Sequence, residues 1–224
     1  MAVVISLGGS MVNGSGNPDV EFLKKFKSLL KGKEKIGIVV GGGKIARDYV
    51  KTASNFSKNQ FWGDSLAVQA TRLNAGLVTR VFPNEACPLV FQDFESAALA
   101  SAQHRIVVMG GTIPGITTDT DSVLLAEAIG AKRLVNLSNV DGVYDSDPSK
   151  NKKAKKFSKM SFSQLLLLAN ASDNRKPGTN FVFDMIACKL AARTKMELHF
   201  VGGKNIQDLP KAIRGKAHRG TIIK

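Results

Sequence analysis

One stretch constrains the fold of this chain more than any other: an apolar run, three glycines and an amphipathic segment, in that order. Residues 36–40 have the β-branched character of a buried strand, and Gly41, Gly42 and Gly43 follow at once. Glycine is costly inside regular elements, so the three glycines indicate a turn. Residues 44–49 then show helical spacing. The stretch predicts a strand-to-helix corner whose bare N–H groups can hold an anion.

Similar corners recur along the chain. Residues 2–7 and 105–109 read as strands that end in Gly8 and Gly110, and residues 133–137 read as a strand that ends at Ser138. In a parallel sheet such corners gather at the carboxyl edge of the strands, where open α/β sheets bind ligands. The sequence therefore predicts an α/β fold with a mainly parallel central sheet and one crevice for phosphorylated ligands.

The other elements follow from hydrophobic periodicity. The pattern predicts helices at 18–30, 61–77, 94–102, 161–169, about 181–193 and 206–213, and strands at 87–90, 197–201 and 221–223. Some polar residues have a plain structural interpretation: Asp93 caps a helix, Asn74 lies on a surface, and Thr118 or Asp119 is an N-cap. Asp64 is either a helix cap or a ligand, and His199 is either buried or exposed.

Length and composition narrow the class of protein. The chain has 224 residues, of which 43% are hydrophobic. This suffices for one large domain over residues 1–224, which is simpler than two small ones. No apolar run approaches the roughly 20 residues that span a bilayer, so we expect a cytoplasmic protein without membrane contact. Cys87 and Cys188 are far apart and lack CxxC spacing, which disfavours a metal site or a disulfide.

The formal charge of +14 attracts polyanions, so a nucleic-acid-binding protein is a rival hypothesis. The lysines cluster in residues 24–35 and 150–159, without interleaved aromatic residues. Lysine is a point charge, whereas bidentate reading of bases favours arginine. We therefore expect these lysines on a solvated surface and no specific nucleic acid partner.

Several familiar motifs are absent from the sequence. Neither GxGxxG nor the GxxxxGK[ST] loop occurs, and no GxSxG nucleophile or cluster of metal-ligating residues is present. By elimination, the glycine corners indicate phosphoryl transfer that works through positioning and electrostatics, without a covalent intermediate.

Eight motifs in the same order carry a family resemblance over nearly the whole chain. They are Gly8-Gly9-Ser10, Gly41-Gly42-Gly43-Lys44-Ile45-Ala46-Arg47, Thr71-Arg72-Leu73-Asn74-Ala75, Gly110-Gly111-Thr112-Ile113-Pro114-Gly115, Thr117-Thr118-Asp119, Leu125-Ala126-Glu127, Asn139-Val140-Asp141-Gly142-Val143-Tyr144 and Asp147-Pro148-Ser149-Lys150. With these motifs the chain resembles the amino acid kinase family, and within it the archaeal type of uridylate kinases. The resemblance implies a three-layer α/β/α sandwich that phosphorylates UMP to UDP with ATP in pyrimidine biosynthesis. It also implies Mg²⁺ accompanying ATP, and a homohexamer.

The resemblance also implies roles for individual residues. The UMP site would comprise Gly42, Asp64, Thr112, Ile113, Pro114, Gly115, Ile116, Thr117 and Thr118. The ATP site would comprise Gly9, Ser10, Gly43, Arg47, Ser138, Asn139, Tyr144 and Asp147. Arg47, Asp119 and Lys44 would be catalytic, with Asp119 organising the charged groups at the centre.

One departure leaves alternatives open. Many members of the family carry a lysine where this chain has Ser6, although archaeal-type members often lack it too, and Lys44, Lys176 or Lys189 could supply that charge. The loss of the lysine also keeps open a nucleotide-binding regulator without turnover. A further alternative is a kinase of the same family with another acceptor, such as an amino acid, carbamate or isopentenyl phosphate.

Overall fold

The structure, a computed structural model, describes residues 2–146, 148, 151–173 and 183–224, without the side chains of 171–173. Its strands are β1 (Ala2–Leu7), β2 (Lys35–Val40), β3 (Ala86–Phe91), β4 (Ile106–Met109), β5 (Arg133–Ser138), β6 (Lys159–Met160), β7 (Glu197–Gly202) and β8 (Thr221–Ile223). Its helices are α1 (Gly9–Asn13), α2 (Val20–Leu29), α3 (Gly43–Ala53), α4 (Gln60–Val81), α5 (Phe94–Gln103), α6 (Thr118–Ala128), α7 (Phe162–Asp173), α8 (Met185–Thr194), the 3-10 helix η1 (Gly203–Asp208) and α9 (Leu209–Ile213).

The described strands form one sheet in the order β3-β4-β2-β1-β5-β7-β8-β6. Strands β1 to β5 and β7 are parallel, and β8 runs antiparallel to β7. In the sheet register, Leu7 lies opposite both Val40 and Leu137, and Met109 lies opposite Val39. The four predicted corners therefore leave the sheet at the same edge and nearly the same level.

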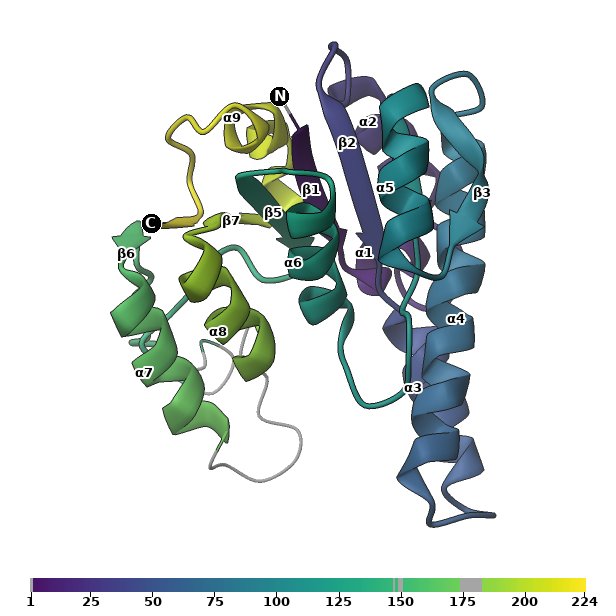
Figure 1. Cartoon of the computed structure of the whole chain (residues 1–224). Coiled ribbons are helices and arrows are strands. Elements are labelled where there is room, and N and C mark those ends of the chain that lie inside the picture. Colours follow the sequence, from purple (N-terminus) through teal and green to yellow (C-terminus); the bar gives the residue numbers. More distant parts are fainter. Residues whose placement is uncertain (1, 147, 149–150, 174–182) are drawn as a thin grey trace.

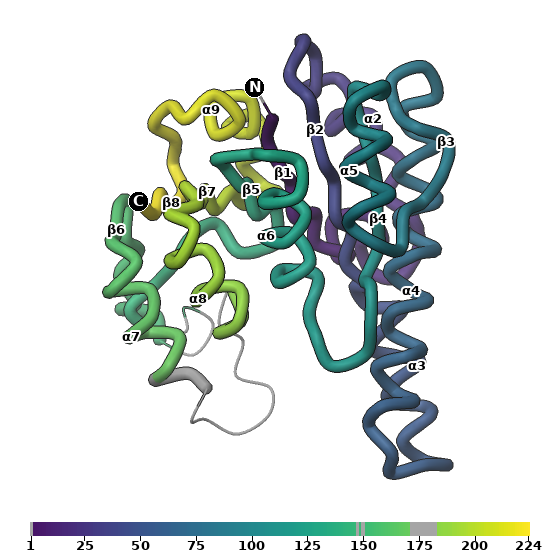
Figure 2. The backbone as a smooth tube through the Cα atoms, viewed as in Figure 1, coloured from purple at the N-terminus to yellow at the C-terminus, as the bar shows by residue number. Residues whose placement is uncertain are grey.

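Alternating side chains give the sheet two buried faces. Val3, Ile5 and Leu7 of β1 pack into one core, while Val4 packs into the other. Helices α2, α4 and α9 supply the first core, and α5, α6, α7 and α8 supply the second (Figure 1). Helix α3 packs against α4, and the two extend together beyond the sheet (Figure 2). The predicted three-layer α/β/α architecture with a mainly parallel sheet is confirmed.

The local structure corrects several expectations. Asn59 rather than Asp64 caps α4, and Thr117 rather than Thr118 or Asp119 caps α6. The predicted helix at 206–213 is divided between the end of a 3-10 helix, in which Asn205 has non-helical dihedrals, and a short α-helix that begins at Leu209 with Pro210 in its first turn. Asp93 does cap α5, as expected, by accepting from the Ser96 N–H. The open question about His199 resolves to a buried residue, 2.9 Å from His218.

Lys35 departs from the expected solvated lysine cluster. It lies at the start of β2 and is only partly exposed. Its ammonium donates to the carbonyl oxygens of Ser101, Ala102 and His104, at 2.8, 2.9 and 3.0 Å. The last carbonyls of a helix lack intrahelical donors and carry partial negative charge. Lys35 thus holds the C-terminal end of α5 against the start of β2.

We expect Lys35→Met to lower the free energy of unfolding by about 1–2 kcal/mol, because three carbonyls lose a charged donor. The exposed Lys33 offers a matched control, and Lys33→Met should leave stability unchanged within about 0.5 kcal/mol. Urea unfolding of the two variants measures the difference. Equal stabilities would mean that water replaces the ammonium at the helix end without cost.

Candidate active site

The first two corners, residues 8–10 and 41–43, pack backbone against backbone. A Cβ atom at Gly9 would lie 2.2 Å from the Gly43 nitrogen and 2.4 Å from the Gly41 oxygen, so no other residue fits there without a shift. Gly43 has a φ of 64°, a conformation that glycine adopts readily. The Gly41 N–H continues the ladder by donating to Leu7 at 2.9 Å. The predicted phosphate-binding residues Gly9, Gly42 and Gly43 are thereby brought together.

Asn74 is buried beside the second corner, so the interpretation as a surface residue is wrong. Only 2% of its surface is exposed. Its amide nitrogen donates to the carbonyl oxygens of Gly41 at 2.8 Å and Gly42 at 3.2 Å. A sequence signal existed: Asn74 lies three residues after Thr71 and four before Val78, at the spacing of one buried helix face.

Asp119 lies in the first turn of α6, directly over the sheet. Its Oδ1 accepts from the Ser6 hydroxyl at 2.9 Å and from the Asn136 amide at 3.0 Å. Burial raises the pKa of Asp119 to about 7, with a further contribution from the nearby Asp184 carboxylate, and the two hydrogen bonds only partly oppose this. Ser6, at the position of the family lysine, therefore contacts the predicted central carboxylate.

The third corner, residues 110–117, is held at both ends. Near its start, Thr112 donates from its hydroxyl to Asp121 at 2.7 Å, and Arg72 donates to the carbonyls of Gly111 at 3.1 Å and Thr112 at 2.7 Å. Burial raises the pKa of Asp121 to about 6, against the hydrogen bonds from Thr112. The start of the predicted UMP loop is therefore bonded to a buried carboxylate, Asp121, which the sequence analysis did not identify as a site residue.

At its far end the third corner is tied to α8. The Thr117 hydroxyl donates to Asp184, and the Thr120 hydroxyl lies 3.0 Å from both carboxylate oxygens of the same residue. Asp184 also caps α8 by accepting from the Ala187 N–H at 2.9 Å. An aspartate just before an apolar helical run is a capping signal, but its contact with the loop is not visible in the sequence.

The predicted cations lie on helix surfaces. Arg47 is exposed on α3, four residues after its first residue, and forms no side-chain hydrogen bond or ion pair with the described part of the chain. Lys44 on the same helix pairs with Asp48 at 2.5 Å. Lys189 is exposed on α8, and Lys176 lies outside the described residues. Among those of these cations that the structure describes, Arg47 is the one on the helix that starts at the second corner and has no competing partner.

Asp64 lies on the stripe of α4 that faces the second corner. A Cβ atom at Gly42 would be 3.5 Å from both the Ala67 oxygen and the Thr71 methyl group, and Asp64 precedes these residues by three and seven positions. Such spacing keeps all three on one helix face. The Asp64 side chain is exposed, and its predicted contact with a ribose stays a prediction.

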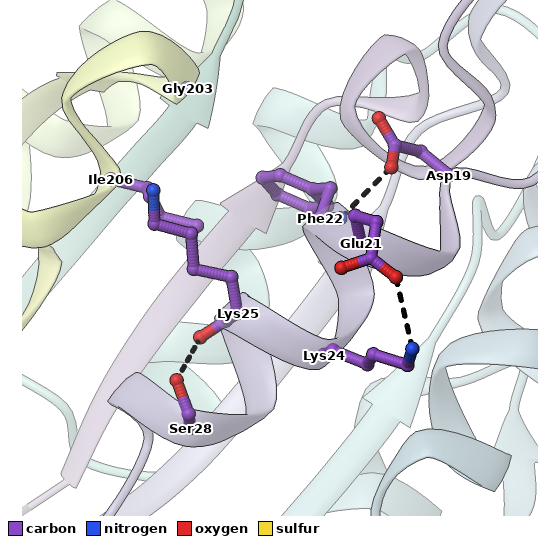
Figure 3. A pocket seen from close by; sticks show the side chains of 8 residues that line it. All are labelled: Asp19, Glu21, Phe22, Lys24, Lys25, Ser28, Gly203 and Ile206. Carbon is purple, nitrogen blue, oxygen red and sulfur yellow. Dashed lines mark hydrogen bonds and ion pairs between the residues drawn. The ribbon is translucent and has the colours of Figure 1, made fainter.

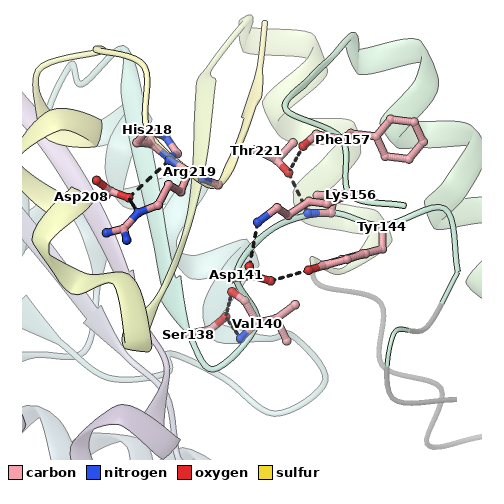
Figure 4. A network of polar contacts seen from close by, with 12 residues as sticks. Ser138, Val140, Asp141, Tyr144, Lys156, Phe157, Asp208, His218, Arg219 and Thr221 are labelled. Atoms are coloured by element: carbon pink, nitrogen blue, oxygen red, sulfur yellow. Dashed lines mark hydrogen bonds and ion pairs between the residues drawn. The ribbon is translucent and has the colours of Figure 1, made fainter. Parts of the chain in front are cut away.

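The fourth corner starts at Ser138 and leads into a polar network (Figure 4). Tyr144 donates to Asp141 at 2.7 Å, and this bond raises the pKa of Tyr144 to about 12. Burial alone would raise the pKa of Asp141, but hydrogen bonds from Lys156 and Tyr144 outweigh it and hold that pKa below its ordinary value. Asn139 is exposed at the same corner, and Asp147 lies outside the described residues.

A separate groove of about 530 Å³ lies between α2 and η1 (Figure 3). Its charged residues are largely occupied: Glu21 pairs with Lys24 at 2.9 Å, and Asp19 caps α2 by accepting from the Phe22 N–H at 2.9 Å. The groove thus presents mixed charge, in contrast to the N–H groups at the glycine corners.

Within the described residues, no three His, Cys, Asp or Glu side chains come together in a group that could bind a metal ion. No helix within the same ranges has both the length and the apolar character needed to cross a bilayer.

Comparisons with known proteins identify the family of this chain. The amino acid kinase family matches residues 1–202. The uridylate kinase of Pyrococcus abyssi is 43% identical over 226 residues, which cover 100% of this chain and 99% of that protein. The uridylate kinase of Archaeoglobus fulgidus is 40% identical over 223 residues, covering both proteins completely.

Solved structures show the same similarity. The crystal structure of the Archaeoglobus fulgidus uridylate kinase has a TM-score of 0.88 and 37% identity, and the match covers 100% of both chains. The UMP kinase structure from Bacillus anthracis, with a TM-score of 0.79, 21% identity and coverage of 100% of this chain and 95% of its own, shares the fold. The family match covers nine-tenths of the sequence, and the relatives align from end to end. This chain therefore belongs to the amino acid kinase family.

Proposed function

We propose that this chain is a uridylate kinase, which transfers the γ-phosphoryl group of ATP to UMP and yields ADP and UDP. One observation carries the proposal: the backbone contact of Gly9 with Gly41 and Gly43, which joins two glycine corners at the carboxyl edge of the sheet. Two adjoining sets of main-chain N–H groups suit two phosphorylated ligands that meet head to head. The full-length similarity to uridylate kinases supports UMP as the acceptor.

The chemistry needs little from the protein beyond positioning. The UMP phosphate is the nucleophile, and it is largely dianionic near neutral pH because its second pKa is about 6. A general base is therefore unnecessary. The barrier is the repulsion between two polyanions, and aligned N–H donors lower it by holding donor and acceptor in line.

In this proposal each corner has a defined task. Gly9, Ser10 and Gly43 hold the ATP phosphates, and Arg47 reaches the transferring group from the first turns of α3. The nucleoside end of ATP lies at the fourth corner, near Asn139 and Tyr144. UMP binds to Gly42 and the third corner, with Asp64 at its ribose.

Mg²⁺ enters the proposal together with ATP. Proteins usually bind this ion through one or two carboxylates plus substrate phosphates, and not through a cage made by the protein alone. Asp119 lies between the first and third corners, and its carboxylate would be the protein ligand of the ion. The ion would supply charge neutralisation on the phosphates. We further propose that the enzyme acts in pyrimidine nucleotide synthesis in the cytoplasm, as a homohexamer.

A panel of acceptors tests the proposed reaction. With ATP and Mg²⁺, we expect UMP to be phosphorylated at least about tenfold faster than CMP, AMP or glutamate, because hydrogen bonds to a base edge discriminate strongly. Release of ADP, coupled to a spectrophotometric assay, measures all four rates. Equal rates on every acceptor would remove the assignment to UMP, and no turnover at all would favour a binding protein.

Arg47→Ala should reduce kcat by about 100-fold or more, since it removes a charged donor from the transferring group. Lys51→Ala is the matched control, because Lys51 is an exposed cation in the last turn of the same helix. It should retain nearly full activity. If both variants have the same kcat, the arginine contributes only to the general positive charge.

The raised pKa of Asp119 predicts a pH-dependent stability. Its pKa of about 7 in the folded protein exceeds its ordinary value of 3.8, so protonation of Asp119 stabilises the folded state relative to the unfolded state. This stabilisation is complete below about pH 4 and is lost as the pH rises through 7. Asp119→Asn carries no charge, so it should be more stable than the wild-type protein at pH 8 and lose that advantage at pH 4. Its kcat should fall sharply at both values.

Urea unfolding at pH 4, 6 and 8 measures this difference. Asp93→Ala provides a control of opposite sign, since the Ser96 N–H lowers the pKa of Asp93 at the start of α5. That variant should be less stable than the wild-type protein at pH 8, with a smaller difference at low pH. A pH-independent effect of Asp119→Asn would show that its carboxylate is not strained by burial.

A further inference from the structure

Helix α4 connects three of the four corners through two side chains one turn apart. Thr71 and Asn74 lie on one face of the helix and are 6% and 2% exposed. The Thr71 hydroxyl accepts from the Gly111 N–H of the third corner at 2.6 Å. Asn74 donates to the carbonyls of Gly41 and Gly42 in the second corner. One rigid helix thus contacts the loops assigned to both substrates.

The contact extends to the first corner as well. Asn13, the last residue of α1, is 1% exposed and donates from its amide to Asn74 Oδ1 at 2.8 Å. Since Asn74 uses its oxygen for α1 and its nitrogen for the second corner, its orientation is determined by the network. The chain Asn13–Asn74–Gly41 therefore joins corners one and two through side chains as well as through their glycine contact.

The bonds from Asn74 also determine where the N–H groups of the second corner point. In a trans peptide the C=O and N–H groups face opposite directions. Because Asn74 draws the carbonyls of Gly41 and Gly42 towards α4, the following N–H groups of Gly42 and Gly43 face away from it. These are the donors at the start of α3 that have no intrahelical acceptor.

Thr71 contacts the third corner as a hydrogen-bond acceptor, whereas Asn74 contacts the second corner as a donor. Thr71 accepts an N–H, donates its own proton to the Val68 carbonyl at 2.6 Å, and brings its methyl group next to Gly42. A single side chain is therefore wedged between the second and third corners. We propose that Thr71 and Asn74 are positioning residues, which set the separation and orientation of the loops for ATP and UMP. This inference rests on the proposed function.

Thr71→Val tests the proposal, because it keeps the shape of the side chain and removes the hydroxyl. We expect kcat/KM for UMP to fall by about 10- to 100-fold, since small displacements of reacting groups have effects of this size. Thr71→Ser retains the hydroxyl and should stay within about threefold of the wild-type value. Thr79→Val is the matched control: Thr79 is equally buried on α4, but its hydroxyl bonds only to Ala75 of the same helix, at 2.9 Å.

A merely structural role would lower the melting temperature of Thr71→Val and Thr79→Val alike and leave their kinetics alike. Positioning instead predicts a kinetic difference between the two variants, with the KM for UMP raised more than the KM for ATP in Thr71→Val. Equal kinetic constants in these variants would overturn the proposal. Asn74→Asp retains the acceptor for Asn13 but loses the donated bonds, and it should reduce kcat/KM for both substrates.

Wild-type turnover of UMP separates this inference from the proposed function. If the wild-type protein does not phosphorylate UMP, the proposed function fails, and calorimetric binding of UMP and of ADP still compares the variants. Positioning then predicts weaker UMP binding by Thr71→Val than by Thr79→Val. Equal binding by the two variants, or no nucleotide binding by the wild-type protein, would overturn the inference on its own terms.

Discussion

The close approach of two main chains, at Gly9 and Gly43, is the constraint on which the rest of the site depends. With a built Cβ atom only 2.2 Å from the Gly43 nitrogen, the two corners can touch only while Gly9 has no side chain. The parallel register of β1, β2 and β5 brings the corners to the same level. Every later contact, from Asn74 below the loops to Asp119 beside them, presupposes this arrangement. The register of the sheet places the two corners at the same height, and the missing side chain of Gly9 permits their contact.

Most polar side chains around the corners form hydrogen bonds with the main chain of the loops. Asn74, Thr71 and Arg72 all bond to main-chain groups of the loops. Asp119 differs, because its bonds come from Ser6 and Asn136 on two neighbouring strands, and burial keeps its pKa high. A serine in place of the usual family lysine leaves this carboxylate without an adjacent cation among the described residues. The strain of burying it is the kind of feature that functional sites retain at the expense of stability.

The sequence was informative where local chemistry has few solutions. Consecutive glycines after an apolar run allow little besides a corner, and Asp93 before a helical pattern is a cap; both predictions are confirmed. It was uninformative where a side chain finds a distant partner. Nothing local distinguishes Lys35, which bonds to α5, from its solvated neighbours, and the spacing that places Asn74 on a buried helix face does not show its partners in the second corner. Asp184 reaches a loop 67 residues earlier, and such pairs are set by tertiary packing.

These long-range pairs bear on how the molecule is made. Ser6 and Asp119 are separated by 113 residues, and Thr120 and Asp184 by 64. Loop-closure entropy must be overcome before such contacts form, so topologies rich in them fold slowly. During synthesis, the first two corners can meet once the residues after β2 have emerged, whereas the far end of the third corner lacks its contact with Asp184 until the start of α8 follows. A ribosome-bound chain halted before residue 184 would carry the third corner bonded to Arg72 and Asp121 at its start but free at its far end.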